Sequence, residues 1–463
     1  MDRVATDDFC ARLADWALTQ RWTRMSAQAQ TRVRHLLVDT IGCALGGRPH
    51  PAVAQAASVA ASLFGAGGVA TGLGSGRRQS SLGAILDSGA AIRALDLNDF
   101  YWGPGLGGHP SDIFATGFAA AEEADRPVAD LLCAVATGYE FYTRLMDLMR
   151  AGDPPWAWDH TCACAPSAAL ICGLLYGLEA PQLTEALAIA LARAPVFSAL
   201  RAGKISSVKA AAPALGQIDG VLAVRLAQAG MTGPKDAVAG ARGLEAIIVP
   251  GADIAHIVPQ AGDAERVLDI TVKRFPCMGT GQAATATAVE LRRRLGGHVE
   301  AIKSIDMEVS DSGIVRRQTA DVYRRPDRRE TADHSFYAIF GMALADGKLE
   351  AAQFAARRWT DPDVVSIIER LTLRPTLPGE SEGVFPARAH VSLLDGTTLV
   401  VDMPYAPGHR LNPIDEAGIA EKYLSFAAPA IGEDKAGRVL SLCLDRARDA
   451  PVREVLALCA SAA

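Results

Sequence analysis

The amino-acid sequence predicts a mainly α-helical protein, in which a smaller α+β lid domain is inserted into a large all-helical domain. Three observations carry this prediction. Apolar side chains recur at helical spacing through almost all of residues 1–265, an alternation typical of strands begins after about residue 266, and helical spacing returns after Pro404. We therefore expect residues 1–266 and 406–463 to form the helical domain and residues 267–405 to form the lid. A site is expected in the cleft between them.

Local signals place the helices of the first domain. Ser26 is of a type that caps helix N-termini, and the helix after it should end at Gly46 and Gly47. Further helices are expected over residues 51–64, 81–95, 112–125, 127–149, 161–177, 181–199 and 206–229. The turn Gly230–Pro234 then stops the last of these helices.

The lid and the tail follow from the second half of the chain. Alternation predicts strands over residues 267–275 and 302–309, with a helix over residues 280–296 between them. The dipeptide Asp395-Gly396 is typical of a hairpin turn, and it joins apolar stretches at 389–394 and 397–401. Two tail helices, near 413–427 and 433–460, are expected to pack onto the first domain.

Composition narrows the class of protein. The 463 residues are 49% hydrophobic and 21% charged, with a formal net charge of −6. No long basic run is present, so a nucleic-acid partner is not expected. Polar residues interrupt every long apolar run, so no membrane span is expected. The nine cysteines are scattered without a CxxC pair, which predicts no disulfide framework, no zinc site and a cytoplasmic location.

The segment Asp96–Asp112 carries the strongest chemical signal. Asp96 and Asp99 end an apolar run, and His109 precedes Pro110. Glycines at positions 103, 105, 107 and 108 are expected to take positive φ and to let the backbone approach a ligand closely. The proline favours an extended His109 that presents its side chain from a loop. The alternative is a segment that only caps and joins two helices.

Two further segments offer a base and cations. His160 follows Asp159 just before an apolar helix, whose positive end favours a neutral imidazole suited to a general base. A structural histidine packed by tryptophans is the alternative. Arg201 and Lys209 precede another apolar helix, where a cation is costly unless it meets an acid or an anionic ligand. A lysine that reaches solvent along its own stem is the alternative there.

The last two segments lie in the second half of the chain. Lys273 and Arg274 precede a glycine-rich turn, which leads through Gln282 into a helix. Two cations beside a helix N-terminus form a receptor for a carboxylate. The alternative is that both cations are exposed at a strand end. Asp333-His334-Ser335 precedes an apolar run that contains Tyr337. Asp and Ser are good helix caps, so this segment could mark only the start of a helix.

Taken together, these segments resemble the MmgE/PrpD family, whose members include 2-methylcitrate dehydratases and cis-aconitate decarboxylases. The resemblance runs through Leu37-Val-Asp-Thr-Ile-Gly-Cys-Ala-Leu45, Asp96-Leu-Asn-Asp-Phe100, Gly108-His-Pro-Ser-Asp112, Asp159-His160, Val208-Lys209, Gly230-Met-Thr-Gly-Pro234, Lys273-Arg-Phe-Pro-Cys277 and Arg329-Glu-Thr-Ala-Asp-His-Ser335. It implies a large helical domain with a smaller lid, a homodimer, a small anionic carboxylate substrate, and no required metal or other cofactor.

The resemblance also implies roles for single residues. Dehydration of a hydroxy acid needs a base, an acid and cations that stabilise a growing carboxylate charge. By resemblance the catalytic candidates are Asp96, His109, His160 and Lys209, and which histidine is the acid stays open. The substrate-binding candidates are Lys273, Arg201, Gln282 and Tyr337.

Three residues depart from the family's pattern. Phe100 stands where the family often has Thr, Tyr337 stands one place early, and Gln282 falls near a position often held by His. These departures bear on the substrate more than on the fold. We expect a metal-free hydro-lyase that dehydrates a 2-hydroxy-tricarboxylate such as 2-methylcitrate. A cis-aconitate decarboxylase, a dicarboxylate epimerase and a non-catalytic member of the family are the alternatives.

Overall fold

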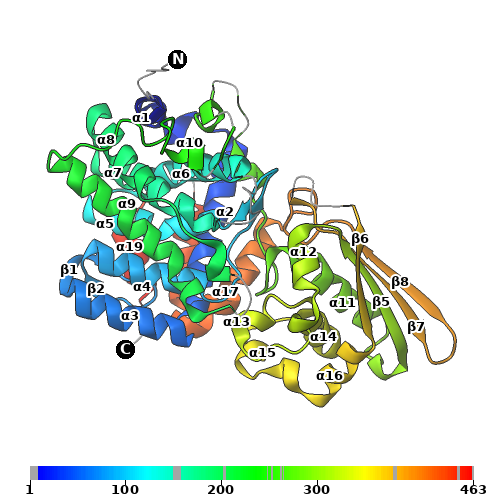
Figure 1. Ribbon diagram of the computed structural model, residues 1–463. Coiled ribbons are helices and arrows are strands. Elements are labelled where there is room, and N and C mark those ends of the chain that lie inside the picture. Colours follow the sequence, from blue (N-terminus) through cyan, green and yellow to red (C-terminus); the bar gives the residue numbers. More distant parts are fainter. Residues whose placement is uncertain are drawn as a thin grey trace.

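The computed structural model describes residues 9–149, 158–201, 205–247, 249–251, 254–260, 263, 265–378, 383–445 and 449–460. Over these residues the protein is mainly α-helical, as the sequence predicts. Figure 1 shows a large helical body and a smaller lobe beside it, and the smaller lobe carries a four-stranded sheet on its outer side. Both described ends of the chain lie in the helical body.

The first half of the chain builds most of the helical body. Its helices are α1 (Phe9–Thr19), α2 (Ala27–Gly47), α3 (Pro51–Phe64), α4 (Ser81–Arg93), α5 (Phe114–Glu123), α6 (Val128–Leu148), α7 (Cys164–Tyr176), α8 (Ala180–Ala192), α9 (Ala212–Gln228) and α10 (Leu244–Ile247). The predicted helices are confirmed, although those predicted over 181–199 and 206–229 are shorter. The Ser26 side chain caps α2 as predicted, because it accepts a hydrogen bond from the Ala29 amide at 3.1 Å.

Two short antiparallel ribbons interrupt these helices. Strand β1 (Ala66–Thr71) pairs with β2 (Arg78–Gln79), and β3 (Tyr101–Trp102) pairs with β4 (Gly107–Gly108). The second ribbon folds the segment after Asp96 back on itself, so that His109 returns toward the end of α4.

The tail of the chain adds three helices to the helical body. They are α17 (Glu416–Ile431), α18 (Glu433–Leu444) and α19 (Val452–Leu458). Helix α17 lies directly against α2: a Cβ atom on Gly42 would stand only 3.2 Å from the Cα of Tyr423. Tyr423 is fully buried in the same apolar cluster as Leu37 of α2.

The smaller lobe packs helices on one face of a mixed sheet. The helices are α11 (Gln282–Arg294), α12 (Gly313–Gln318), α13 (Arg329–Ala332), α14 (Phe336–Asp346), α15 (Ala351–Ala355) and α16 (Pro362–Glu369). Strand β5 (Ile302–Ser310) runs parallel to β6 (Leu371–Leu377) and antiparallel to β7 (Ala387–Leu393), which pairs with β8 (Thr398–Met403). The predicted hairpin is confirmed, with Gly396 at φ 89° in its turn.

The strand predicted over residues 267–275 is wrong. The segment begins with a short 3-10 turn, Arg266–Asp269, and then continues as extended chain that forms a single bridge between Thr271 and Phe100. Ile270 and Val272 are both completely buried. Burial in the apolar cluster of the helical body, rather than a place in a sheet, therefore produces the alternating pattern.

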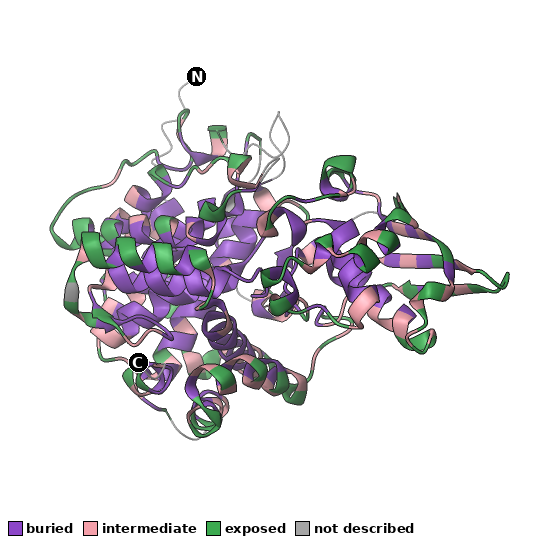
Figure 2. Ribbon diagram, turned by 90° about the horizontal axis from the view of Figure 1, so that it is seen from below, coloured by how far each residue is buried: buried purple, intermediate pink, exposed green. Residues whose placement is uncertain are grey.

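Buried apolar residues form two main clusters (Figure 2). The larger one joins helices α1–α9 to α17–α19, and the second lies inside the smaller lobe. Phe100 and Trp102 belong to the second cluster although they precede it by more than a hundred residues. The domain boundaries at 266 and 405, and the role of the smaller lobe as a lid, stay predictions.

Candidate active site

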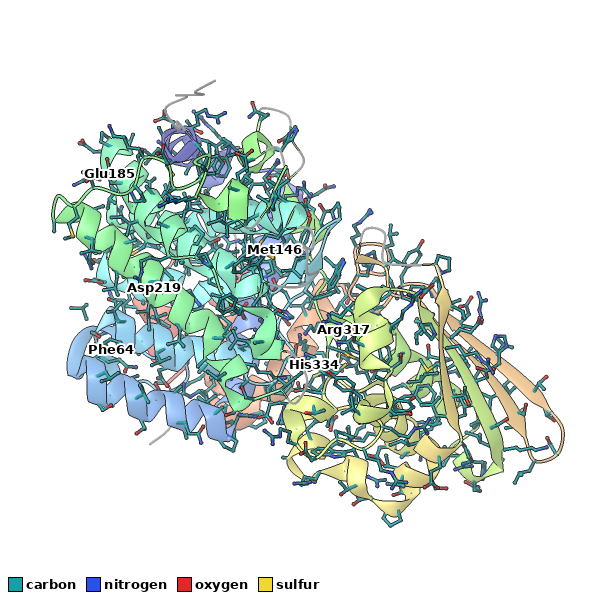
Figure 3. The ribbon with its side chains drawn as sticks, viewed as in Figure 1. Phe64, Met146, Glu185, Asp219, Arg317 and His334 are labelled. Carbon is teal, nitrogen blue, oxygen red and sulfur yellow. The ribbon has the colours of Figure 1, made fainter. Side chains whose placement is uncertain are left out.

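A cavity of about 260 Å³ lies between the helical body and the smaller lobe. Its charged or ionisable lining residues are Arg93, Asp96, His109, Asp159, His160, Arg201, Arg317, Tyr323 and His334. The last three come from the smaller lobe and the others from the helical body. Figure 3 shows Arg317 and His334 on the side of the smaller lobe that faces the helical body.

The strained residue at this cavity is Asp96. It follows the end of α4 with φ at +53°, in the left-handed region that Asp tolerates better than most residues with a side chain. The glycines at 103, 105, 107 and 108 were expected to take positive φ, and that expectation is wrong. They are needed for close packing instead: a Cβ on Gly108 would stand 2.7 Å from the hydroxyl of Tyr142, and one on Gly107 would overlap the ring of Trp102.

Three buried cations converge on Asp96. Its Oδ1 lies 2.5 Å from Lys273 Nζ and 2.9 Å from an Arg93 nitrogen, and its Oδ2 lies 3.5 Å from Lys209 Nζ. Lys273 also donates to the backbone carbonyl of Asp96 at 2.9 Å. Burial alone would raise the pKa of Asp96, but Arg93, Lys273 and Lys209 hold it well below its usual range. Asp96 is therefore an anion that is poorly suited to accept a proton.

Hydrogen bonds fix the tautomer of His109. Its Nδ1 lies 2.7 Å from the carbonyl oxygen of Asp99, which can only accept, so Nδ1 carries the proton. Its Nε2 then has a lone pair, which accepts from Arg93 at 3.0 Å. Burial lowers the pKa of His109 well below its usual value, and Arg93 acts in the same direction. His109 is a neutral imidazole whose Nε2 is an acceptor at the cavity.

Asp99 supports the loop rather than the chemistry. Its Oδ1 accepts from the amide and hydroxyl of Ser111, at 3.0 and 2.6 Å, and its Oδ2 accepts from the hydroxyl of Tyr139 at 2.8 Å. Burial raises its pKa to about 6. These bonds hold the chain around His109 against α6.

His160 has the complementary arrangement. The Tyr142 oxygen accepts from the His109 amide at 3.3 Å and lies 2.8 Å from His160 Nδ1. The Tyr142 hydroxyl donates its proton to Nδ1 of His160, so this nitrogen carries no proton. The single ring proton of a neutral His160 is therefore on Nε2. That Nε2 is buried and has no hydrogen-bond partner among the described residues, and it lies 3.9 Å from Asp159 Oδ1. Burial lowers the pKa of His160 to about 3, so the ring is neutral.

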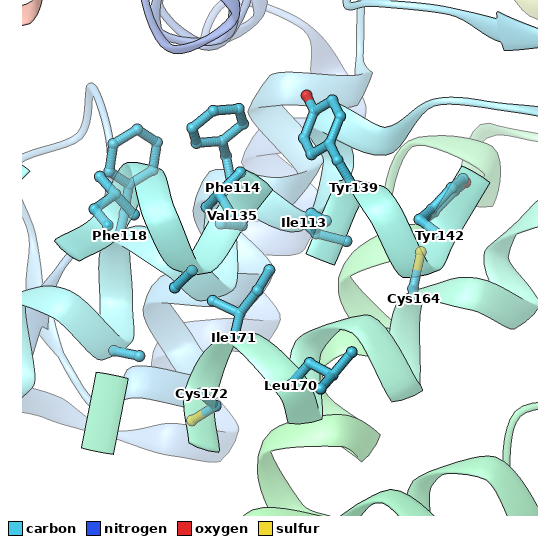
Figure 4. Packing of buried hydrophobic residues seen from close by; sticks show 14 of the residues in the cluster. Ile113, Phe114, Phe118, Val135, Tyr139, Tyr142, Cys164, Leu170, Ile171 and Cys172 are labelled. Carbon is cyan, nitrogen blue, oxygen red and sulfur yellow. The ribbon is translucent and has the colours of Figure 1, made fainter. Parts of the chain in front are cut away.

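The body behind these two histidines is closely packed. Figure 4 shows Tyr139 and Tyr142 of α6 beside Phe114 of α5 and Cys164 of α7. The rings of His109 and His160 meet edge to face, with centroids 5.1 Å apart. All nine cysteines are free thiols, and all but Cys133 are buried.

Arg201 presents unused donors to the cavity. Its Nε donates to Asp159 Oδ2 at 2.8 Å, while its two terminal nitrogens are buried without a partner among the described residues. Burial would raise the pKa of Asp159, but Arg201 and His160 lower it to about 2. Asp159 also caps the turn that carries His160, because its Oδ1 accepts from the Thr161 amide at 3.1 Å. The two donors of Arg201 are spaced to receive a carboxylate.

Asp333 and His334 complete the polar side of the site. Both carboxylate oxygens of Asp333 lie 2.9 Å from Lys209 Nζ, and Oδ1 lies 2.5 Å from His334 Nδ1. Burial lowers the pKa of His334, and Lys209 acts in the same direction. Lys209 and Lys273 are therefore behind Asp96 and Asp333 and do not line the cavity.

Besides Lys273, two further predicted substrate-binding residues, Gln282 and Tyr337, lie outside the lining of the cavity. The Gln282 amide accepts from the Arg274 and Phe275 amides at 3.0 and 3.1 Å, and it donates to the Phe275 carbonyl at 2.9 Å. Its hydrogen bonds thus hold the turn after Lys273. The Tyr337 hydroxyl donates to the Thr319 carbonyl at 3.1 Å. A different tyrosine, Tyr323, lines the cavity.

The sequence interpretation missed several lining residues. Arg93 is a cation at the end of an apolar run in the sequence, and this pattern could have identified it as a candidate. Arg317 and Tyr323 lie in a polar stretch with no distinctive pattern, and only the fold brings them to the cavity.

Asp96, Asp333 and His334 offer three ligand atoms within 4.8 Å of one another, a spacing compatible with a metal ion. The charge around them is unfavourable for a dication, because Lys209, Lys273 and Arg93 already neutralise the two carboxylates.

Among the described helices, none is both long and apolar enough to cross a membrane.

Comparisons with known proteins agree with this architecture. Residues 11–257 match the MmgE/PrpD N-terminal domain, and residues 275–446 match the MmgE/PrpD C-terminal domain. The cis-aconitate decarboxylase-like protein oryM of Aspergillus oryzae (strain ATCC 42149 / RIB 40) is 25% identical over 484 residues, which cover 99% of this chain and 98% of that protein. The two family domains together span most of the sequence, and the chain belongs to the MmgE/PrpD family.

Proposed function

We propose that this protein is a lyase of small polycarboxylates, which dehydrates a 2-hydroxy-tricarboxylate such as 2-methylcitrate by acid/base elimination without a metal. One observation carries the proposal. Two guanidinium nitrogens of Arg201 and the Nε2 of His160 are buried without a hydrogen-bond partner in the part of the chain that the structure describes, and both residues line the same cavity. Such donors are costly unless a ligand completes their hydrogen bonds, and a carboxylate suits the guanidinium geometry.

The charges at the cavity favour an anionic substrate. Arg93, Arg201 and Arg317 line it, and the carboxylates among its described lining residues are those of Asp96 and Asp159. Arg93 keeps its Nε buried without a partner among the described residues. The proposal assigns one substrate carboxylate to Arg201 and leaves Arg93 to stabilise the charge that grows on a second carboxylate during the reaction.

The two tautomers divide the proton transfers between the histidines. His109 Nε2 is the acceptor, so it takes the proton from the carbon beside a carboxylate when Arg93 turns from this nitrogen to the substrate. His160 takes up a proton once the bound substrate has raised its pKa, and the resulting imidazolium donates its Nε2 proton to the departing hydroxyl and returns to the neutral ring. The carbon–hydrogen electron pair becomes the new double bond, the carbon–oxygen bond breaks, and the hydroxyl leaves as water.

Substrate charge would tune both histidines. Burial and neighbouring arginines hold the pKa of each ring low. A bound tricarboxylate adds negative charge beside them and raises both pKa values toward the working pH, where proton transfer is most effective. We also propose that Lys209 and Lys273 act through Asp96, because their ammonium groups are bonded to Asp96 and Asp333 rather than open to the cavity.

A second candidate is decarboxylation of cis-aconitate. It is favoured by the likeness over nearly the whole chain to a protein described as cis-aconitate decarboxylase-like. The same groups could serve, because decarboxylation also builds negative charge on carbon and then needs a proton donor. A dicarboxylate epimerase and a non-catalytic family member stay alternatives.

The deciding experiment gives the purified protein 2-methylcitrate, citrate and cis-aconitate separately. A gain in ultraviolet absorbance from a new double bond with 2-methylcitrate supports dehydration, and release of carbon dioxide from cis-aconitate supports decarboxylation. Silence with all three substrates would refute both proposals.

We further propose that the protein is a homodimer. Leu215, Leu222 and Leu226 follow one face of α9 at helical spacing and are 49%, 42% and 39% exposed in the single chain. Light scattering coupled to size-exclusion chromatography tests this, and a monomeric mass would refute it.

A further inference from the structure

A groove of about 480 Å³ lies on the helical body, at the place where the chain leaves for the smaller lobe and where it returns. The chain leaves through residues 266–281, the first connection, and returns through residues 404–415, the second connection. The groove is lined by Arg32 and His35 of α2, by Leu268 of the first connection, and by Arg410 and Ile414 of the second, and we call it the connection groove. It has no described lining residue in common with the cavity of the candidate active site.

The ionisable side chains in the described lining of the connection groove are all basic. They belong to Arg32, His35 and Arg410. Two carboxylates stand beside them, because Arg410 Nε lies 4.0 Å from Asp269 Oδ1 and His35 Nε2 lies 3.2 Å from Glu416 Oε2. The side chains of these acids are 39% and 62% exposed, so water screens both pairs and an anion can replace the acids at small cost.

Arg32 lacks a full counter-charge. One of its terminal nitrogens donates to the backbone carbonyl of Ile270, and it forms no ion pair with the carboxylates that the structure describes. Burial lowers the pKa of its guanidinium group, and the charge of Asp39 offsets this only in part. Asp39 itself is paired with Lys422 at 2.5 Å. An anion in the connection groove would supply the charge that Arg32 lacks.

The connection groove borders the contacts that join the two connections. The Val272 amide of the first connection donates to the Gly408 carbonyl of the second at 3.2 Å. Between Ile270 and Val272, Thr271 exchanges two backbone hydrogen bonds of 2.8 Å with Phe100, which lines the cavity of the candidate active site. A ligand that binds the arginine of α2 and the arginine of the second connection would therefore hold both connections together, close to that cavity.

A dianion suits the connection groove better than a single carboxylate does. One guanidinium group satisfies a carboxylate, whereas the phosphate of a monoester carries close to two charges at neutral pH and three acceptor oxygens, which can bind cations from two elements. Leu268, Pro413 and Ile414 also line the groove and offer apolar contacts to the organic part of such a molecule. The volume of the groove is in the range of small-molecule sites.

We propose that the connection groove is a second ligand site, in which Arg32, His35 and Arg410 bind the phosphate dianion of a small phosphate monoester. The inference goes beyond the proposed function, because it concerns a different site. Its tests measure binding without turnover.

The first test is calorimetry of the wild-type protein with inorganic phosphate and, separately, with phenyl phosphate. We expect one site per chain for each, with phenyl phosphate bound about fivefold more tightly because its ring covers apolar side chains of the groove. Equal affinities would show that the free ion and not an ester is the ligand, and absence of binding by both compounds would overturn the site itself.

The second test uses two substitutions with opposite expected effects on the binding of phenyl phosphate. Arg410→Gln removes a cation and should weaken binding by about tenfold, whereas Asp269→Asn removes the competing acid and should strengthen it by about twofold to fivefold. Arg126→Gln is the matched control, because Arg126 has a similarly loose pair with Asp130, at 3.7 Å, outside the groove. Weaker binding in both Arg410→Gln and Asp269→Asn, or no change in either, overturns the inference.

The third test separates the connection groove from the cavity of the candidate active site. Phenyl phosphate should still bind to Arg201→Lys, and it should slow amide hydrogen exchange of the wild-type protein in peptides that cover residues 266–272 and 405–412. Binding that is lost in Arg201→Lys but kept in Arg410→Gln would place the anion in the cavity and overturn the inference, and so would unchanged exchange in both peptides. Neither result bears on the proposed lyase activity, which the substrate assays test on their own.

Discussion

Arg201 donates from its Nε to Asp159 at 2.8 Å, and both of its buried terminal nitrogens lack a hydrogen-bond partner among the described residues. The hydrogen bond to Asp159 orients the guanidinium group, and the two terminal nitrogens can then donate to a carboxylate. Asp159 also caps the turn that carries His160, so a single carboxylate positions both groups. A substitution of Arg201 is therefore the most direct test of carboxylate binding at this site.

Replacement of Arg201 by Lys should weaken substrate binding. Lysine keeps the charge but cannot present two parallel donors, so we expect a fall in kcat/KM on the order of tenfold to hundredfold, mostly through KM. Steady-state kinetics and a thermal unfolding curve measure the two effects. Arg193→Lys is the matched control, because Arg193 pairs with Asp219 on the surface. Unchanged kinetics in Arg201→Lys would exclude the proposed carboxylate contact.

His160 should make the protein sensitive to mild acid. Its pKa in the folded state is lowered to about 3, so between pH 6.5 and 3 the unfolded chain binds a proton that the folded chain refuses. The stability is therefore present above pH 6.5 and lost as the pH falls. Wild type should lose about 2 kcal/mol more than His160→Gln between pH 7 and pH 5.

Urea unfolding of both proteins at the two pH values measures this difference. His298→Gln is the control, because the His298 side chain is 75% exposed. If wild type and His160→Gln lose equal stability, then His160 does not stay neutral in the fold.

Asp96 should stabilise the protein as an anion. In Asp96→Asn, Lys273 and Arg93 lose a buried carboxylate, which should lower the free energy of unfolding by about 3–5 kcal/mol. The backbone is not the cause, because Asn also tolerates positive φ. Asp311→Asn, at an exposed ion pair with Arg316, is the control.

The pH dependence of the Asp96 effect has a defined sign. A lowered pKa means that the stabilisation is present above the unfolded pKa and is lost only as the pH falls through the folded pKa. The difference between wild type and Asp96→Asn should thus be constant from pH 8 to pH 5. A difference that disappears near pH 6 would contradict an ionised Asp96.

The sequence predicted much of the fold because its signals are local. Ser26 and the Asp395-Gly396 turn act within four residues of where they stand, and both predictions are confirmed. The strand prediction over residues 267–275 is wrong because burial of Ile270 and Val272 in the apolar cluster of the helical body leaves the same alternation as a strand. Periodicity reports which side chains are buried, not what covers them.

The sequence predicted those site residues whose charged or ionisable side chain stands beside an apolar segment or a glycine-rich turn. Asp96, His109, His160 and Arg201 all line one cavity, whereas Gln282 lies outside its lining. An amide that satisfies a turn looks the same in sequence as one that binds a ligand. The distinction depends on contacts with residues 274–277 that only the folded chain brings into place.

Removal of metal should leave activity intact. Asp96, Asp333 and His334 are close enough to bind an ion, but Lys209 and Lys273 already lie against the two carboxylates. We expect full turnover after dialysis against EDTA, with metal content measured by mass spectrometry. Loss of activity that zinc or iron restores would contradict the metal-free mechanism.

Lys422 should support the site from the tail helix α17. Its Nζ lies 2.5 Å from Asp39 Oδ1 and donates to the carbonyls of Leu97 and Lys273 at 3.1 and 2.7 Å. It thereby joins α2 to the two segments that carry Asp96 and Lys273. Lys422→Met leaves Asp39 buried without its cation, so unfolding should become easier by about 3–5 kcal/mol and kcat should fall.

A double-mutant cycle separates this contact from general damage to the core. Asp39→Asn removes the charge that Lys422→Met leaves unpaired, so the double variant should lose less stability than the sum of the single variants. Lys348→Met, at an exposed pair with Glu350, is the control for the loss of a lysine. Additive losses would mean that Asp39 and Lys422 do not act as a pair, and the tail helix would then hold the site through apolar packing alone.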